Sequence, residues 1–156
     1  MTKQELQNRL QDIEWEDFEV KLAIGGVPKS AWESVSAFSN TAGGWLIFGI
    51  EEKNGIFNIV GVSNPSKIEH EFLNSLNGEK FNIKIRVNSY KYNFDDKIVL
   101  AFYIPISKQK PVYFNSLSNS FIRSGSADRR ATKEEIDTMF RDQSFGTKTS
   151  DTIENY

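Results

Sequence analysis

The sequence predicts an α+β domain in which helices pack on a mixed or antiparallel sheet. Runs of alternating apolar and polar residues come in groups, and segments with apolar residues three or four apart lie between the groups. Strands in runs with helices between them are typical of this fold class. The length of 156 residues, with 38% apolar and 13% aromatic residues, fits one domain with its own hydrophobic core.

Near the N-terminus, apolar residues four apart predict a short amphipathic helix over residues 3–12. Apolar and charged residues then alternate over residues 17–22, which predicts a half-buried strand. The charged set of that strand points away from the core. Glu19 is therefore expected to be an exposed carboxylate, and Lys21 a cation beside it that partly neutralises it.

The stretch AFSNTAGGWLIFGIEE places two adjacent glycines between a helical pattern and an apolar run. Ser30 and Glu33 have the spacing of a capping box and predict the start of that helix. Phosphate-binding loops have their glycines before a helix, whereas here the helix precedes Gly43 and Gly44. We therefore interpret the pair as a helix end and tight turn. The apolar run over residues 45–50 is predicted to be a central strand covered on both faces.

A hairpin and a third helix are predicted next. Asn54 and Gly55 form a strong type I′ turn signal, and IFNIVGV supplies the returning strand. Asn64 before Pro65 marks a helix start. The buried stripe of this helix repeats every fourth residue: Ile68, Phe72 and Leu76.

Four more strands are predicted in the second half of the chain. Over residues 81–92 one face is apolar, and the other carries basic and aromatic side chains, namely Lys84, Arg86, Tyr90 and Tyr92. The core strand KIVLAFYIPI is expected to pair with it across a turn at Asp95 and Asp96, and PVYFN with SFIRSG to form another hairpin.

Thr132 and Glu135 have the spacing that caps a last helix. We place one domain over residues 1–142. Residues 143–156 are predicted to be a polar tail or the start of a linker to a further domain.

Composition excludes several kinds of site. The chain has no cysteine, which excludes disulfides, thiolate zinc sites and a cysteine nucleophile, and its single histidine, His70, excludes paired-histidine metal binding. A metal, if bound, must therefore sit on carboxylates. No apolar run is long enough to span a membrane and the N-terminal residues do not resemble a signal peptide, so a cytoplasmic location is expected.

Charge is divided unevenly along the chain although the net charge is only -2. Residues 1–79 carry a net charge of -6, residues 80–133 carry +8, and residues 134–156 carry -4. If folding preserves this separation, the later strands present a positive surface suited to a polyanion such as nucleic acid.

The candidate nucleic-acid-binding residues are the cations of this basic segment: Lys84, Arg86, Arg123, Arg129 and Arg130. Each can contact phosphate without reading sequence. Tyr90 and Tyr92 are candidates to stack on unpaired bases. Acidic residues cluster before the first strand and directly after the buried one, and carboxylates from two neighbouring strands could bind a hard divalent cation.

The ordered series EDFEVK, AFSNTAGGWLIFGIEEKNGIFNIVGV, KIVLAFYIP, KPVYF and FIRSGSADRRAT resembles the Schlafen-type AlbA_2 domain over about residues 14–142. The resemblance implies a DNA-binding domain, often the N-terminal part of longer bacterial proteins described as predicted transcriptional regulators. It therefore also implies further domains in the full-length protein.

Animal proteins with this domain are metal-dependent RNA endonucleases that use three acidic residues. The resemblance places these at Glu14, Glu19 and Glu51, which would then be both catalytic residues and ligands to Mg²⁺ or Mn²⁺. The sequence departs from the family pattern at Val20, where phenylalanine is usual, and at Glu51, where aspartate is usual.

Our interpretation is a cytoplasmic domain that binds nucleic acid, with DNA preferred over RNA, within a transcriptional regulator. Binding itself is expected to need no cofactor, and no membrane is expected as partner. The first alternative is a metal-dependent endoribonuclease, in which a single lobe would imitate the paired lobes of the animal enzymes by forming a homodimer. The second alternative is a protein interaction or oligomerisation module.

Overall fold

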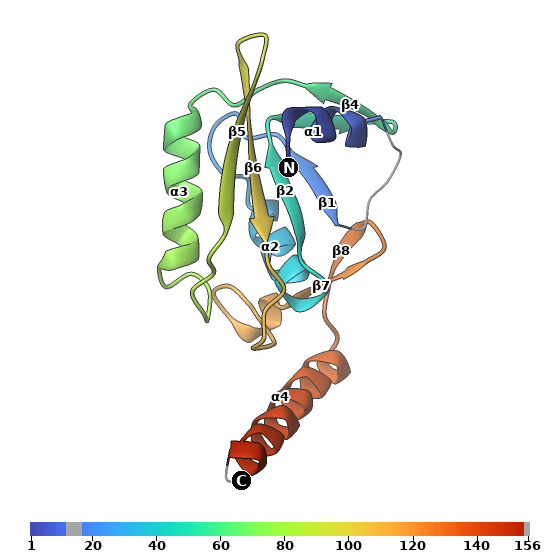
Figure 1. Cartoon of the computed structure of the whole chain (residues 1–156), viewed down its shortest axis with the longest axis vertical. Helices are drawn as coiled ribbons and strands as arrows, with labels where there is room; N and C mark the ends of the chain where they lie inside the picture. Colours follow the sequence, from blue (N-terminus) through green and yellow to red (C-terminus); the bar gives the residue numbers. More distant parts are fainter. Residues whose placement is uncertain (12–16, 155–156) are drawn as a thin grey trace.

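The computed structural model describes residues 1–11 and 17–154, with side chains described as far as Gln143 (Figure 1). A four-stranded sheet lies at the centre, and the last helix extends away from it. The first half of the chain contains α1 (Lys3–Arg9), β1 (Phe18–Lys21), α2 (Ser30–Asn40), β2 (Gly44–Phe48), β3 (Ile50–Lys53), β4 (Ile56–Ile59) and α3 (Pro65–Asn77). The second half contains β5 (Asn88–Phe94), β6 (Lys97–Ile104), a 3-10 turn (Leu117–Asn119), β7 (Phe121–Ser124), β8 (Ala127–Arg130) and α4 (Lys133–Glu154).

The sheet is mixed, as predicted for an α+β domain. Its order is β1-β2-β6-β5, with β1 parallel to β2 and the other neighbours antiparallel. The apolar strand β2 is central, as predicted, and each of its residues except Trp45 is buried. Two small hairpins, β3–β4 and β7–β8, lie outside this sheet.

The first face of the sheet carries the larger core cluster. Alternate residues of β2 and β6 pack there against α2 and α3. Phe72 of α3 lies at the centre of this cluster, with its ring centroid 4.4 Å from that of Phe102 and 5.2 Å from that of Phe48. The predicted stripe of α3 is fully buried, so its helical periodicity identified the core correctly.

The second face is covered by described elements over only part of its area. Helix α1 packs Leu6 into a smaller cluster with Ile47 and Val99, and the β3–β4 hairpin adds Phe57 and Ile59. In Figure 1, α1 crosses the upper part of this face, while α2 lies behind the sheet. No helix in the described part of the chain is long and apolar enough to cross a membrane.

The glycine pair is a helix end and a tight turn, as predicted. Gly43 has φ +73°, and its N–H donates to the carbonyl of Phe38 at 2.8 Å, which closes the end of α2. Gly44 begins β2 with no room for a side chain, because a Cβ there would lie 2.3 Å from the Phe38 ring. The pair thus joins α2 closely to the central strand.

Both predicted two-residue turns are also present. Asn54 and Gly55 have φ of 53° and 77°, and Asp95 and Asp96 have φ of 51° and 68°. Positive φ at both central positions is the requirement of a type I′ turn. These turns fix the registers of the β3–β4 and β5–β6 hairpins.

The predicted strand over residues 81–92 is wrong in its first half. Strand β5 begins only at Asn88. The predicted alternation of buried and exposed side chains before it is nevertheless correct, and Ile85 is buried. The Ile85 N–H donates to Leu76 of α3 instead of a strand neighbour. Continued pairing with β6 would also bring this segment opposite Pro105, which has no N–H to donate.

The predicted hairpin of PVYFN with SFIRSG is also wrong. Only isolated bridges form there, Tyr113 with Ser120 and Phe81 with Phe114. Strand β7 pairs instead with β8 across Gly125, which favours a local turn over a longer loop.

Of the two predicted helix caps, the one at α2 is wrong and the one at α4 is correct. Ser30 does not cap α2, because the N-cap residue is Lys29, and the first turn instead uses the Pro28 and Lys29 carbonyls. At α4 the predicted reciprocal pair is present: Glu135 N–H donates to Thr132 Oγ1 at 3.2 Å, and Thr132 N–H donates to Glu135 Oε1 at 2.8 Å. The helix runs on past residue 142.

Candidate functional site

The most buried charge in the described part of the chain is the guanidinium of Arg123, whose side chain is 3% exposed. Its Nη1 lies 2.9 Å from Glu19 Oε2 and 2.8 Å from Asp128 Oδ1, and its Nη2 donates to the carbonyl of Phe18 at 2.9 Å. The guanidinium also lies 4.7 Å from the centre of the Phe38 ring. Arg123 therefore joins β1, α2 and the β7–β8 hairpin.

The local folds explain this convergence. In the β7–β8 register Arg123 is directly opposite Asp128, so the hairpin itself forms that ion pair. Asp128 also accepts a hydrogen bond from Ser34 of α2. On β1, Glu19 points away from the cluster that holds Phe18 and Val20, and so faces the hairpin.

Glu19 was expected to be exposed, and that expectation is wrong. Its side chain is 22% exposed, with Arg123 on one side and Lys21 Nζ 3.8 Å away on the other. Burial raises the pKa of the Glu19 carboxyl, although Lys21 and Arg123 both act to lower it. The predicted role of Lys21 as a neighbouring counter-charge agrees with this geometry.

Sequence reasoning missed Asp128 and Ser34 as partners in this network. The signal that could have found Asp128 is Gly125, since a tight turn at that residue pairs position 123 with position 128. Arg123 was predicted to be an exposed phosphate contact. That exposure is wrong, because the guanidinium is enclosed by acids, a carbonyl and an aromatic ring.

Two of the three implied metal-binding acids, Glu19 and Glu51, lie within the described residues. Glu14 lies outside the described residues. Glu51 lines an open pocket of about 350 Å³ together with Lys21, Glu52 and the start of α2. Among the described residues no three acidic or histidine side chains are grouped so that they could hold a metal ion.

Two predicted cations on β8 are exposed but already have partners. Arg129 forms a bidentate pair with Glu135 at 2.8 Å, which lowers the pKa of the Glu135 carboxyl to about 2. Arg130 donates to Ser118 O and Asn119 Oδ1, and its guanidinium lies over the Phe121 ring.

The predicted cations Lys84 and Arg86 are exposed, and within the described part of the chain neither forms an ion pair. They line a pocket of about 250 Å³ where the segment before β5 separates from the end of β6. Ser39 also lines this pocket. It is 1% exposed, and its Oγ has no hydrogen-bond partner among the described atoms.

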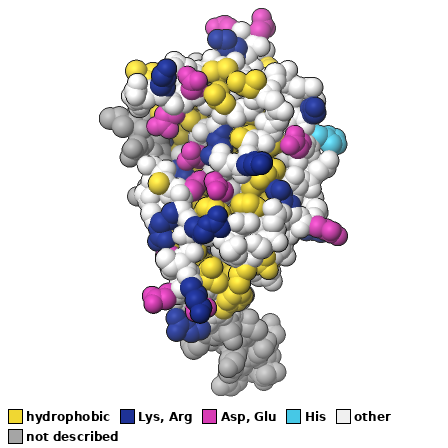
Figure 2. All heavy atoms as spheres, turned by 180° about the vertical axis from the view of Figure 1, so that it is seen from behind, with side chains coloured by type: hydrophobic (Ala, Val, Ile, Leu, Met, Phe, Trp, Pro, Cys, Tyr) yellow, Lys and Arg dark blue, Asp and Glu magenta, His cyan; other side chains and the backbone are white. Residues whose placement is uncertain are grey.

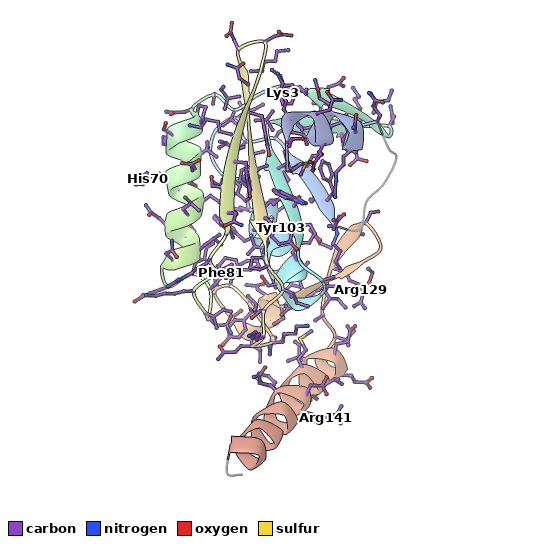
Figure 3. All side chains as sticks on the ribbon, in the orientation of Figure 1. Lys3, His70, Phe81, Tyr103, Arg129 and Arg141 are labelled. Atoms are coloured by element: carbon purple, nitrogen blue, oxygen red, sulfur yellow. The ribbon has the colours of Figure 1, made fainter. Side chains whose placement is uncertain are left out.

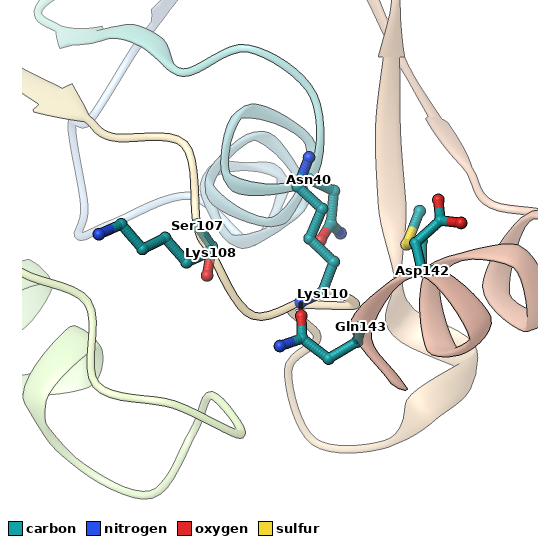
Figure 4. A pocket seen from close by; sticks show the side chains of 7 residues that line it. Asn40, Ser107, Lys108, Lys110, Asp142 and Gln143 are labelled. Atoms are coloured by element: carbon teal, nitrogen blue, oxygen red, sulfur yellow. Dashed lines mark hydrogen bonds between the residues drawn. The ribbon is translucent and has the colours of Figure 1, made fainter. Parts of the chain in front are cut away.

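Another pocket, of about 400 Å³, lies beside the pocket lined by Lys84 and Arg86 and shares Ser107 with it (Figure 4). Lys108 and Lys110 line it and make no ion pair with any described side chain. Gln143 of α4 accepts a hydrogen bond from the Lys110 N–H at 3.4 Å. The residues before β5 and those after β6 thus carry four cations without an ion-pair partner in the described structure.

The face behind the view of Figure 1 is not uniformly basic. Figure 2 shows that basic and acidic side chains lie next to one another on this face. The charge separation along the chain is therefore only partly preserved. It survives at the end of the sheet around these two pockets, where Asp142 is the one acid among the lining residues and forms no ion pair with a described side chain. Arg123 and Arg129, in contrast, are matched by acids.

The two candidate stacking residues differ in exposure. Tyr92 is buried under the N-terminal segment, where its hydroxyl donates to the Met1 carbonyl and burial raises its pKa. This excludes it as an exposed stacking residue. Tyr90 is half-buried and contacts Trp45, with ring centroids 5.5 Å apart.

The mixed sheet, the glycine turn after α2 and the β7–β8 hairpin clamped by Arg123 define a small α+β domain with cations at one end of its sheet. The sequence profile of the family described as Schlafen, AlbA_2 matches residues 14–132, which span every strand of the fold. The chain belongs to the Schlafen AlbA_2 family.

Two solved structures resemble the chain. The first is the solution structure of the N-terminal domain of an ATP-dependent DNA helicase RecG-related protein from Nitrosomonas europaea, with 22% identity, a TM-score of 0.59, and coverage of 82% of this chain and 92% of that one. The second is a crystal structure from Corynebacterium diphtheriae, with 21% identity, a TM-score of 0.51, and coverage of 80% of this chain but only 24% of that one. Both support the fold. No curated protein matches the chain significantly.

Proposed function

We propose that this domain binds nucleic acid, with DNA preferred over RNA, as one part of a transcriptional regulator. The observation that carries the proposal is the group of four cations around the two pockets, which have no ion-pair partner among the described residues: Lys84, Arg86, Lys108 and Lys110. Cations that are not neutralised by the protein can displace counterions from phosphate. Membership of the AlbA_2 family and the helicase-related neighbour agree with this proposal.

A titration of the purified chain with DNA and with RNA at two salt concentrations tests the proposal. We expect affinity to fall as salt rises. The combined Lys84→Gln and Arg86→Gln variant should bind more weakly, and its slope of log affinity against log salt should be shallower by about 1 for each phosphate that it no longer contacts. Arg129→Gln is the matched control, because that guanidinium is already paired with Glu135. Absence of salt-sensitive binding to either polymer would favour a protein interaction module.

Metal-dependent RNA cleavage is a second candidate. It is favoured by one observation: Lys21, which contacts Glu19, also lines the open pocket that contains Glu51, so two of the three implied acids have neighbouring positions. Glu14, Glu19 and Glu51 would hold Mg²⁺ or Mn²⁺, which would supply an activated water for phosphodiester cleavage.

Incubation with transfer RNA and Mn²⁺ tests this second candidate. Glu19→Ala alone is a poor control, because it also removes one of the two ion pairs of the buried Arg123. Glu51→Gln is better, since Glu51 forms no ion pair with any described residue. Cleavage that survives Glu51→Gln would remove this acid from the mechanism.

A further inference from the structure

Three half-buried aromatic side chains lie together on the second face of the sheet, beyond the part that α1 covers: Trp45, Tyr90 and Tyr103. The centroid of the Trp45 ring is 5.5 Å from that of Tyr90 and 5.2 Å from that of Tyr103. Figure 3 labels Tyr103 on the lower part of this face, and Figure 1 shows no described helix or hairpin in front of it there. We call these three residues the aromatic platform.

The sheet register explains how the platform forms. Trp45 and Tyr103 are directly opposite one another on β2 and β6. Tyr90 lies on β5, one strand further, and its partner on β6 is Ala101. Ala101 has a small side chain and is completely buried, and the Trp45 and Tyr90 rings on the strands either side of it contact each other. Three neighbouring strands thus supply one continuous aromatic surface.

Two cations that form no ion pair with any described residue lie just before β5, the strand that carries Tyr90. Ile83, Ile85 and Val87 pack into the cluster on the first face. The alternate side chains of this extended segment, Lys84 and Arg86, are turned away from that cluster and are exposed. They lie four and two residues before Asn88, the β5 residue that pairs with Tyr103 on β6. Two of the four cations that support the proposed function therefore lie at the end of the sheet where Tyr103 is placed.

We propose that the aromatic platform stacks on the unpaired bases of a single-stranded nucleic acid, while Lys84 and Arg86 contact its phosphates. This inference rests on the proposed nucleic-acid binding and specifies its ligand. Bases in a duplex are stacked on one another and do not present their faces to a sheet, whereas unpaired bases do. The cations at the adjoining end of the sheet favour a polyanion over an apolar protein partner. The hydroxyls of Tyr90 and Tyr103 also suit a surface that contacts solvent and polar ligands.

Fluorescence anisotropy with labelled oligonucleotides at fixed salt tests the inference. The probes are a single-stranded oligo-dT, the matching oligo-U, and a DNA duplex of the same length. The main variant is the double substitution Tyr90→Leu and Tyr103→Leu, which removes the aromatic faces but keeps apolar volume. Tyr113→Leu is the control, because this half-buried tyrosine lies outside the platform and pairs with Ser120 in an isolated bridge. Circular dichroism and thermal melting establish that each variant is folded.

We expect the wild-type chain to bind a single-stranded probe more tightly than the duplex, and the double variant to bind the single strand about tenfold more weakly for each stacking ring that is removed. Duplex affinity and the Tyr113→Leu control should be unchanged. The two single-stranded arms decide between DNA and RNA as the natural polymer.

Two outcomes would overturn the inference and remain distinguishable from each other. If the wild type binds no polymer in a salt-sensitive manner, the proposed function itself fails. If the wild type binds, but the folded double variant keeps its single-strand affinity or the duplex binds at least as tightly, only the stacking inference fails. A double variant that melts well below the wild type is replaced by Tyr90→Phe and Tyr103→Phe. This variant keeps the aromatic faces and should retain single-strand binding, so loss of binding in it would contradict stacking.

Discussion

Arg123 shows how burial changes the role of a charged residue. In the sequence it resembles the neighbouring arginines, yet its guanidinium is enclosed by Glu19, Asp128 and the Phe18 carbonyl. Removing one partner of a buried ion pair leaves an uncompensated charge in the protein interior, where water cannot solvate it. The same residue type on β8, Arg129, remains exposed and pairs with Glu135 in water.

We expect Arg123→Met to lower the free energy of unfolding by about 3 kcal/mol, because Glu19 and Asp128 would then face each other without their shared cation. Urea denaturation of the wild type and the variant measures this change. Arg129→Met is the control, and its effect should be much smaller since exposed ion pairs contribute little. Equal effects of the two substitutions would contradict the buried network.

Glu19 also predicts a pH dependence of stability. Its pKa is raised in the folded state, chiefly by burial, so the folded protein binds this proton more readily than the unfolded chain. The contribution of Glu19 to stability is therefore fully present below the ordinary carboxyl pKa of 4.5 and is lost as pH rises through the folded pKa. Glu135 acts in the opposite direction: its lowered pKa of about 2 gives stability above pH 4.5 that is lost as pH falls through about 2.

Denaturation of the wild type and of Glu19→Gln at several pH values from 4 to 7 separates the two effects, because Glu135 is present in both proteins. We expect the free energy of unfolding of the wild type, taken relative to the variant, to decrease as pH rises above 4.5. Parallel pH profiles would show that Glu19 titrates alike in the folded and unfolded chains.

At the scale of the elements, the junction of α2 with β2 depends on the absence of a side chain at Gly44. A Cβ at that position would lie 2.3 Å from one atom of the Phe38 ring and 2.9 Å from the Asp17 carbonyl oxygen. Phe38 is fully buried, so it has no free space into which it could move.

Gly44→Ala is therefore expected to lower the free energy of unfolding by about 3 kcal/mol, the upper end of the usual cost of overpacking. Gly25→Ala is the matched control: nothing lies within 4 Å of a Cβ at Gly25, so its stability should be unchanged or slightly higher. Urea denaturation measures both variants. A Gly44→Ala protein as stable as the wild type would mean that α2 shifts easily on the sheet.

The sequence predicted those elements whose signal is local. The turns at Asn54 and Asp95, the end of α2 and the stripe of α3 all follow from residue type and spacing within a few positions. The segment before β5 was predicted wrongly because its alternation is real, but its N–H groups are used by α3 and its continued partner would be Pro105. Such competition between elements is not visible in a local pattern.

The candidate site was predictable to a similar degree. Lys84 and Arg86 were identified correctly as exposed cations, since they alternate with isoleucines that pack on the larger core cluster. The burial of Arg123 was not predicted, because it depends on the pairing of three elements that are far apart in the chain: β1, α2 and β7–β8. Trp45, in the strand predicted to be covered on both faces, packs on the smaller core cluster but is only partly buried.

At the scale of the whole molecule, the charged residues that stabilise the fold and the cations proposed to bind nucleic acid occupy different places. Arg123 and its partners lie between β1, α2 and the β7–β8 hairpin, whereas Lys84 and Arg86 lie where β5 and β6 separate. The two groups share no hydrogen bond or ion pair among the described residues. Substitutions at sites without shared partners usually have additive effects.

Stability and binding should therefore respond to different substitutions. The combined Lys84→Gln and Arg86→Gln variant is expected to melt like the wild type but bind nucleic acid more weakly, with a shallower salt dependence. Arg123→Met is expected to be less stable but, at a temperature where it remains folded, to bind with wild-type affinity and salt dependence. The combination of all three should show the sum of the separate changes in each measurement, within about 0.5 kcal/mol. If Arg123→Met alone weakened binding in the folded protein, the buried network would have to position the cations at the other site, and the division between structural and binding charge would be wrong.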